Sequence, residues 1–298
     1  MYKGIILAGG HGTRFYPMTA VYSKQLINIY DKPMIYYPLS MLMMMGIRDI
    51  LIVADAATIE HYSKLFGSGT TLGLNLKYAE QDCPRGLADA LIIGSPFIGH
   101  DSVVFTLGDN LFYGDMDVFR YTLKRHEVAT IFAYYVDDPH EYGVVTFDRN
   151  HVATSLEEKP ENTQSNFAIP GLYIYDNSIV DIVKKITPSD RGELEITDVN
   201  KEYLKQGTLK VEHLGRGIAW LDTGSPQSLL EASNFIAAIE KRQGLKVGCI
   251  EEVALRQRFI APEDFKRLIS IAPKNSQYNK YLRTILKEYQ YANRYDAT

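Results

Sequence analysis

The chain has few cysteines, no long apolar run and no excess of basic residues. Its two cysteines, Cys83 and Cys249, lie far apart in the sequence, whereas a secreted fold held by disulfides carries more. No segment reaches the roughly 18 apolar residues of a membrane-spanning helix, and the first apolar run is too short for a signal peptide. A net charge of −4 disfavours general binding to nucleic acid or anionic membranes. We therefore expect a cytoplasmic protein that binds neither nucleic acid nor membranes.

The seven histidines are scattered and stand at no metal-ligand spacing with cysteine, so a zinc site is not expected. Hydrophobic residues make up 46% and charged residues 23% of the 298 residues, which are ordinary values for a globular protein. This length is enough for one large α/β domain or two small ones.

The first 24 residues carry the most informative pattern. A short apolar run over 4–8 predicts a buried strand, and the three glycines Gly9, Gly10 and Gly12 follow it. Such a turn exposes backbone N–H groups to a polyanion, and Arg14 and Lys24 add positive charge nearby. A P-loop would need Gly-Lys-Ser or Gly-Lys-Thr, and a dinucleotide fingerprint would need a third glycine where Phe15 stands. The pattern predicts a phosphate site, although the glycines alone also fit a structural turn.

Strands and helices alternate over the first third of the chain, which indicates parallel βαβ units. We expect strands at 49–54, 76–79 and 103–107, and helices at 36–46, at 57–66 and from about 87. The middle third predicts strands at 129–136, 143–147, 171–175, 207–214 and 218–221. From 226 onward the pattern is helical. One compact domain with a helical C-terminal extension fits best.

Two aspartates follow predicted strands in the same way. Asp109 comes after the 103–107 strand and Asp222 after the 218–221 strand, at the ends where parallel sheets bind ligands. Two such carboxylates can hold Mg²⁺, which prefers oxygen ligands, although each aspartate alone could simply start a turn. Taken alone, Lys159 would be a solvated surface lysine, and Gln81 a solvated loop residue.

Several motifs, in order, resemble the signature of the sugar-nucleotide pyrophosphorylases, and they look closest to the thymidylyltransferases that act on glucose-1-phosphate. The resemblance runs along nearly the whole chain. Its motifs are Leu7-Ala8-Gly9-Gly10-x-Gly12-Thr13-Arg14-x-x-Pro17-x-Thr19 with Lys24, then Tyr30–Ser40, Leu107–Asn110, Leu156–Pro160, Arg191–Asp198 and Trp220–Gly224.

The resemblance implies a Rossmann-like, GT-A-like α/β nucleotidyltransferase fold, with a mostly parallel or mixed sheet flanked by helices. We expect a core over 1–225, divided into a nucleotide-binding part over about 1–115 and a strand-rich sugar-phosphate-binding part over about 116–225. Residues 226–298 would form a helical extension for oligomerisation, since the family is typically homotetrameric. The run Met41–Met45 fits either core packing or oligomerisation.

The implied reaction is Mg²⁺-dependent attack of glucose-1-phosphate on dTTP, giving dTDP-glucose and pyrophosphate. It would be a first step toward dTDP-deoxysugars, such as dTDP-rhamnose, for cell-surface polysaccharides. The implied catalytic residues are Arg14, Lys24, Asp109, Lys159 and Asp222, with Asp109 and Asp222 as metal ligands. The implied nucleotide-binding residues are Leu7, Gly9, Gly10, Gly12, Thr13, Arg14, Lys24, Gln25, Gln81, Gly86 and Asp109. The implied sugar-phosphate-binding residues are Tyr142, Gly143, Glu158, Lys159 and Ile169. The amide of Gln81 suits thymine because it offers a donor and an acceptor together.

Five positions depart from the thymidylyltransferase pattern: Phe15, Asn28, Arg85, Pro170 and Ser225. None belongs to the implied charged set, but Arg85 and Pro170 bear on base and sugar preference. A uridylyltransferase acting on a related sugar-1-phosphate remains an alternative. A catalytically inactive nucleotide-sugar sensor is another, disfavoured because such relatives typically lose the loop arginine or a metal aspartate.

Overall fold

The computed structural model describes residues 1–10, 12–125 and 128–295. His11 of the glycine-loop motif and the last three residues of the expected 226–298 extension lie outside the described residues. No helix in the described part of the chain is both long and apolar enough to cross a membrane.

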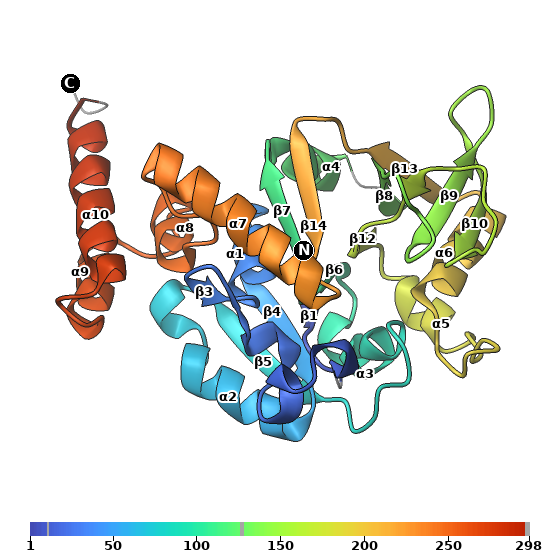
Figure 1. The fold of residues 1–298 in the computed structure, drawn as a ribbon, viewed down its shortest axis with the longest axis horizontal. Coiled ribbons are helices and arrows are strands. Elements are labelled where there is room, and N and C mark those ends of the chain that lie inside the picture. The colour runs from blue at the N-terminus through green and yellow to red at the C-terminus, as the bar shows by residue number, and fades with distance from the viewer. Residues whose placement is uncertain (11, 126–127, 296–298) are drawn as a thin grey trace.

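Within these residues, ten strands form one mixed sheet (Figure 1). Its neighbouring strands are, in order, β10 (Ala153–Glu158), β9 (Gly143–Phe147), β11 (Phe167–Ala168), β8 (Ala129–Tyr135), β12 (Leu172–Tyr175), β6 (Ser102–Leu107), β1 (Tyr2–Leu7), β4 (Asp49–Ala54) and β5 (Asn75–Glu80), with β13 (Leu209–His213) beside β8. β6, β1, β4 and β5 run parallel, whereas β12 is antiparallel to both β6 and β8. The α/β mixed-sheet prediction is confirmed.

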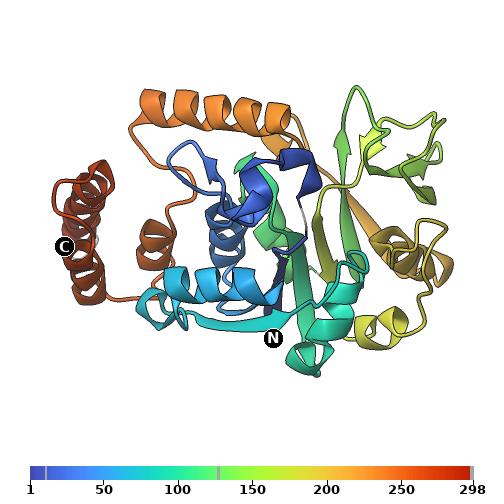
Figure 2. The same ribbon diagram turned by 60° about the horizontal axis from the view of Figure 1, so that its bottom comes forward.

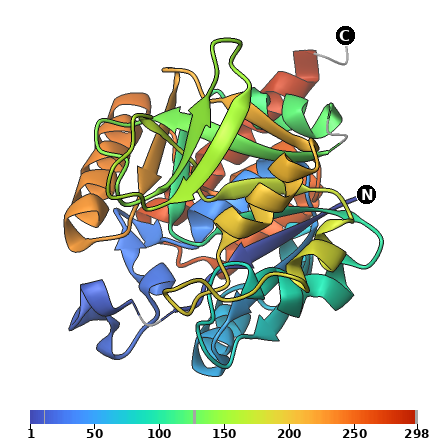
Figure 3. The same cartoon turned by 90° about the vertical axis from the view of Figure 1, so that its right-hand side faces the viewer.

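Two hydrophobic cores cover the two faces of this sheet. Successive strand residues point to opposite faces, so Ile6 of β1 joins one core while Ile5 and Leu7 join the other. The first core includes side chains of α1 (Tyr36–Met44), α2 (Ala56–Phe66), α4 (Asp117–Lys124) and α8 (Ile250–Arg256). The second includes side chains of α3 (Asp89–Ile98), α5 (Ile179–Val183) and α6 (Ile196–Lys205). Helix α6 packs beside β10 at one end of the sheet (Figure 3).

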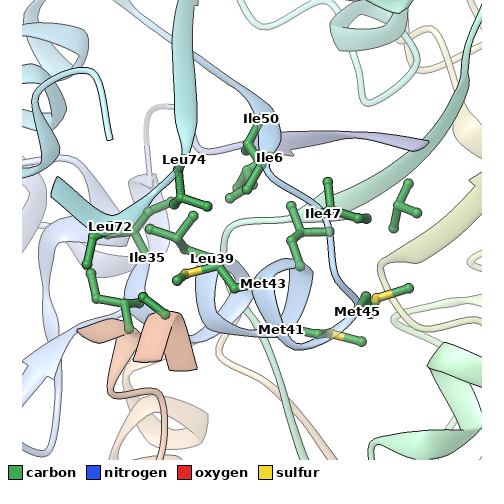
Figure 4. Close-up of a cluster of buried hydrophobic side chains, with 14 of the residues drawn as sticks. Ile6, Ile35, Leu39, Met41, Met43, Met45, Ile47, Ile50, Leu72 and Leu74 are labelled. Carbon is green, nitrogen blue, oxygen red and sulfur yellow. The ribbon is translucent and has the colours of Figure 1, made fainter. Parts of the chain in front are cut away.

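The methionine-rich run packs inside the protein. Met41, Met43 and Met45 have exposed fractions of 2%, 0% and 7%, and they lie in the same core as Ile6 of β1 (Figure 4). The flexible thioether side chain fills irregular gaps in such cores. Of the two roles considered for this run, the structure therefore shows core packing.

The C-terminal extension is helical, as predicted. α7 (Pro226–Gln243) begins with a capping box in which Ser225 Oγ accepts the Ser228 N–H, and it ends at the left-handed Gly244. The last helices, α9 (Pro262–Ile271) and α10 (Gln277–Tyr295), stand at the end of the molecule opposite β9 and β10 (Figures 1 and 2). Leu282 and Ile285 of α10 are buried in the first core.

One strand lies elsewhere than expected. β14 (Ile218–Asp222) does not join the main sheet but pairs antiparallel with β7 (Asn110–Gly114), a strand that the sequence did not predict. Asp222 is therefore not at the end of a parallel strand beside Asp109. Cross-strand pairing places it opposite Asn110 instead. A second small ribbon pairs β2 (Asn28–Ile29) with β3 (Lys32–Pro33).

A buried ion cluster ties this small ribbon to α7. Lys32, whose side chain is 2% exposed, lies 3.0 Å from Glu240 Oε1 and also pairs with Asp31. Lys246 pairs with Asp31 as well, and it lies 3.2 Å from Glu240 Oε2. Buried charges persist only when they are paired, so this cluster fixes how the ribbon sits against the extension.

Glu240→Ala should lower the free energy of unfolding by about 1–3 kcal/mol, because it removes one of the two carboxylates that pair with the buried Lys32 ammonium. Urea unfolding measures the change. The matched control is Glu231→Ala, on an exposed position of the same helix, which should stay within about 0.5 kcal/mol of wild type. Equal losses in both variants would contradict the role of the buried pair.

Candidate active site

A cavity of about 480 Å³ lies between the nucleotide-binding and sugar-binding parts that the sequence predicts. Most of the predicted site residues line it. They are Gly9, Gly10, Gly12, Thr13, Arg14, Lys24, Gln25, Asp109, Tyr142, Gly143, Glu158, Lys159, Ile169 and Asp222. Leu7, Gln81 and Gly86 are not among the lining residues.

The glycine loop leaves β1 and forms one wall. Leu7 itself is core, with its side chain 7% exposed and its carbonyl accepting the Gly108 N–H at 2.8 Å. Gly12 adopts a φ of +52°, and a Cβ there would lie 2.9 Å from Thr19 Cγ2 and 3.3 Å from Lys24 Cβ. Only glycine fits this close approach without strain. The loop therefore packs directly against the turn that carries Lys24.

Lys24 and Asp109 form the central ion pair of the cavity. Lys24 is 8% exposed, its Nζ lies 2.6 Å from Asp109 Oδ2, and it stands over the Phe15 ring at 5.2 Å. Burial alone would raise the pKa of Asp109. The Lys24 charge and hydrogen bond, with a further bond from Asn110, outweigh burial and hold that pKa below its ordinary value. Asp109 is therefore ionised at neutral pH.

Asp222 reaches Asp109 through the pairing of β14 with β7. Thr223 donates from both its N–H, at 3.1 Å, and its Oγ1, at 2.7 Å, to the Asp109 carbonyl. Asn110 adds a second tie, because its Oδ1 accepts from Trp220 Nε1 at 2.6 Å while its Nδ2 donates to Asp109 Oδ1 at 3.0 Å. These bonds fix two carboxylates in one cavity.

Burial and the charge of Asp109 raise the pKa of Asp222 to about 7, and the cations Lys24, Arg14 and Lys159 oppose that rise. Asp222 therefore lies within electrostatic reach of a carboxylate and of three cations from different parts of the chain. Such a perturbed carboxylate in a cavity is typical of a functional site.

The two aspartates fit a magnesium ion. Both supply hard oxygen ligands, and a divalent cation would oppose the burial and the repulsion by Asp109 that raise the Asp222 pKa. The described residues contain no group of three or more histidine, cysteine, aspartate or glutamate side chains placed to hold a metal. Two carboxylates suffice for Mg²⁺, which usually keeps waters and substrate phosphates among its ligands.

The opposite wall carries Glu158, Thr197 and Lys159. Glu158, the last residue of β10, accepts from Thr197 Oγ1 at 2.5 Å. A Cβ at Gly143 would meet both of these side chains, at 3.4 Å and 3.1 Å, so glycine leaves room beside the carboxylate. Lys159 has a φ of +42°, and its N–H donates to the Tyr142 carbonyl at 3.0 Å. Non-glycine residues in this strained conformation cluster at functional sites.

The structure adds cavity residues for which the sequence predicted no role. Arg191 and Thr197 belong to the Arg191–Asp198 motif, Trp220 belongs to Trp220–Gly224, and all three line the cavity. Their place in these motifs was a sequence signal that they matter, but only the structure shows which residues they contact. Arg191 Nη1 lies 3.7 Å from Glu158 Oε1 and 3.7 Å from Glu195 Oε1.

Glu141 is a further addition, with no signal in the sequence. It lines the cavity and pairs with Arg14, its Oε2 lying 3.1 Å from the arginine Nη2. The two residues are 127 positions apart in the sequence, so no local sequence pattern could predict this contact.

Two predicted base-binding residues, Gln81 and Gly86, do not line the cavity. Gln81 follows β5, is 6% exposed, and donates from Nε2 to Asp89 Oδ2 at 2.8 Å. Gly86, with a φ of +113°, is crossed by the Leu194 backbone, which a Cβ would approach to 2.5 Å. The next residue, Leu87, lines the cavity. The role of Gln81 and Gly86 in base binding stays a prediction.

Comparisons with known proteins agree on one family. A sequence model of the nucleotidyl transferase family matches residues 3–239. A glucose-1-phosphate thymidylyltransferase of Neisseria meningitidis serogroup A is 49% identical over 290 residues, which cover 96% of this chain and 100% of the relative. A protein of the same name from Mycolicibacterium smegmatis is 51% identical, with coverages of 95% and 99%. A Bacillus anthracis crystal structure to which the same activity is ascribed, solved with sucrose, matches with a TM-score of 0.73 at 37% identity, over 79% of this chain and 95% of that one.

The raised pKa of Asp222 predicts a pH-dependent stability without metal. In the unfolded chain this carboxyl loses its proton near 3.8, but in the fold it does so near 7, so the folded state binds more protons between these values. Stability from this group therefore falls as pH rises from 4 to 7. Asp222→Asn should remove this decrease in stability with rising pH.

In EDTA, Asp222→Asn should gain stability over wild type by roughly 1–2 kcal/mol between pH 5 and pH 8, a value reduced by partial exposure of the carboxylate to water. Scanning calorimetry at the two pH values measures it. Asp181→Asn changes an exposed aspartate of α5 and is the control. A pH-independent difference between Asp222→Asn and wild type would contradict the raised pKa.

Proposed function

Because this chain belongs to the nucleotidyl transferase family and to its glucose-1-phosphate thymidylyltransferases, we propose that it forms dTDP-glucose and pyrophosphate from dTTP and glucose-1-phosphate. One observation supports this proposal most strongly. Asp109 and Asp222 meet in a cavity with Arg14 and Lys24 on the glycine-loop side and Lys159 on the sugar side. A site that brings two phosphorylated substrates together needs cations on both sides of the reacting phosphorus.

The reaction needs no protein nucleophile. A phosphate oxygen of glucose-1-phosphate attacks the α-phosphorus of dTTP, and the bond to the leaving pyrophosphate breaks as the new bond forms. The attacking phosphate is already ionised at neutral pH, so no general base is required. The barrier is the repulsion between two anions, and this chain's cations would lower it.

Each residue group has a defined task in this proposal. The loop N–H groups, Arg14 and Lys24 would stabilise charge on the triphosphate, and Lys159 would hold the attacking phosphate in place. Asp109 and Asp222 would hold Mg²⁺. When bound, magnesium offsets negative charge on the reacting phosphates. Thr197 already donates to Glu158, so both side chains would accept hydrogen bonds from sugar hydroxyls.

Two of the departures from the family pattern, Phe15 and Arg85, do not disturb the charged residues of the cavity. Phe15 is buried beneath Lys24, and Arg85 points to Asp82 and Asp89 and does not line the cavity. All five implied catalytic residues line the cavity, which favours an active enzyme over an inactive sensor. We further propose a homotetramer that supplies dTDP-glucose to dTDP-deoxysugar synthesis, such as that of dTDP-rhamnose.

Pyrophosphate release from a matrix of nucleotides and sugar-1-phosphates tests the proposal. We expect dTTP with glucose-1-phosphate to be the best pair, and activity to disappear on exhaustive chelation and return with Mg²⁺. Asp109→Asn should stay folded and lose most turnover. A preference for UTP would favour the uridylyltransferase alternative, and full activity after chelation would exclude the metal role.

Substitutions of Lys24 and of Lys159 should affect different steps of the reaction. Lys159→Ala should leave dTTP affinity nearly intact in calorimetry without sugar, while turnover falls by roughly 10²–10³, as when one preorganised donor is lost. Lys24→Ala should weaken dTTP binding itself. Lys210→Ala, at an exposed position outside the cavity, is the control. Loss of dTTP binding in Lys159→Ala, with normal saturation by glucose-1-phosphate, would contradict this division.

A further inference from the structure

The Gln81 amide is held by an acidic residue. Asp89, the first residue of α3, is 2% exposed, and both of its carboxylate oxygens are engaged. Oδ2 accepts from Gln81 Nε2 at 2.8 Å, and Oδ1 accepts from Arg85 Nε at 3.2 Å. Arg85 also lies 3.0 Å from Asp82 Oδ1, so the guanidinium bridges Asp82 of the loop and Asp89 of the helix.

This contact determines which way the Gln81 amide points. The two ends of a glutamine amide have nearly the same shape, and their environment decides which one is the donor. A carboxylate paired with arginine only accepts hydrogen bonds, so the NH₂ end of Gln81 must face Asp89. The oxygen end is then directed elsewhere.

The Gln81 oxygen is available to a ligand. No described residue forms a hydrogen bond with Gln81 Oε1. This oxygen is also not fully enclosed, because among the described residues the fully buried side-chain polar atom without a partner is Asn200 Nδ2. Gln81 therefore presents an acceptor, Oε1, beside the second hydrogen of Nε2. Thymine and uracil present the complementary pair, an N3–H beside a carbonyl, whereas cytosine presents an acceptor beside an amino group.

Gln81 lies at the nucleotide end of the site. Its N–H donates to the Ala54 carbonyl at 2.8 Å, and a Cβ on Gly9 of the glycine loop would lie 3.1 Å from Ala54 Cα. Gly9 and Gln81 thus flank the same residue at the end of β4. Leu87, from the loop that carries Arg85 and leads to Asp89, lines the cavity.

We propose that Asp89 is a positioning residue that, paired with Arg85, fixes the Gln81 amide and thereby selects the imide edge of thymine or uracil over cytosine. This inference rests on the proposed function in placing a nucleotide in the cavity. It gives Arg85, a departure from the family pattern, a role in base selection.

The test compares dTTP with dCTP. In Asp89→Asn the new amide can donate to Gln81 Oε1, so the flipped glutamine that suits cytosine becomes accessible. The ratio of kcat/KM for dTTP to that for dCTP should fall roughly tenfold, with the KM for glucose-1-phosphate unchanged. Asp82→Asn makes the same chemical change on the other aspartate that pairs with Arg85, and it should keep the ratio.

A double-mutant cycle separates positioning from a structural effect. If Asp89 acts through Gln81, then Asp89→Asn should not alter the ratio further in a Gln81→Ala background. Circular dichroism checks folding, and Asp89→Ser, whose hydroxyl can donate or accept, replaces the asparagine variant if that one does not fold. An unchanged ratio in Asp89→Asn, or an equal change without Gln81, would overturn the proposal.

Failure of the proposed function can be recognised separately. Turnover of dTTP with glucose-1-phosphate by the wild-type enzyme decides that function before any variant is compared. The ratio of dissociation constants for dTTP and dCTP, measured by calorimetry, needs no turnover and follows the same cycle. A shift in this ratio that depends on Gln81 supports the positioning role even where catalysis fails.

Discussion

The pairing of β14 with β7 is the constraint on which the site depends. Its register sets Asp222 opposite Asn110, and Thr223 bonds the Asp109 carbonyl across a sequence separation of 114 residues. Two carboxylates are thereby forced into one partly buried cavity. Their repulsion must be offset by cations, and Lys24, Arg14 and Lys159 all act on Asp222 from three different segments. The fold thus builds a cation-rich site around two anions.

The sheet explains why the cavity lies where it does. Four strands, β6, β1, β4 and β5, form a parallel unit. β12 runs antiparallel beside β6 and lies between this unit and the strands of the second part. Ligands of α/β sheets bind at the carboxyl ends of parallel strands, and here the second part of the chain supplies the facing wall. The two walls are also joined away from the reacting atoms, because Leu194 bonds both Arg85 and Ala88 through its backbone. The loop that carries Arg85 and the loop that carries Leu194 therefore support each other.

Buried neighbours hold the site residues in position. Phe15 packs beneath Lys24, Asn110 bonds Asp109, Gly171 and Trp220, and Asp89 bonds Gln81. The buried Lys32–Glu240 pair holds the ribbon that follows the Lys24 turn against α7. Catalytic groups must be held in one geometry to be effective, and here buried polar bonds supply that rigidity. The helical extension contributes to it through Glu240.

Local sequence patterns were enough to predict several elements of the fold and one wall of the cavity. Apolar runs and turn residues predicted β4, β6 and β9, and glycines with Arg14 and Lys24 marked the loop that lines the cavity. Other features depend on how distant segments pack together in the fold. The tertiary structure placed β14 with the unpredicted β7 and turned Gln81 toward Asp89. It also brought Thr197 to Glu158. These contacts depend on strand register and packing between segments far apart in the chain, and a local pattern carries no record of either.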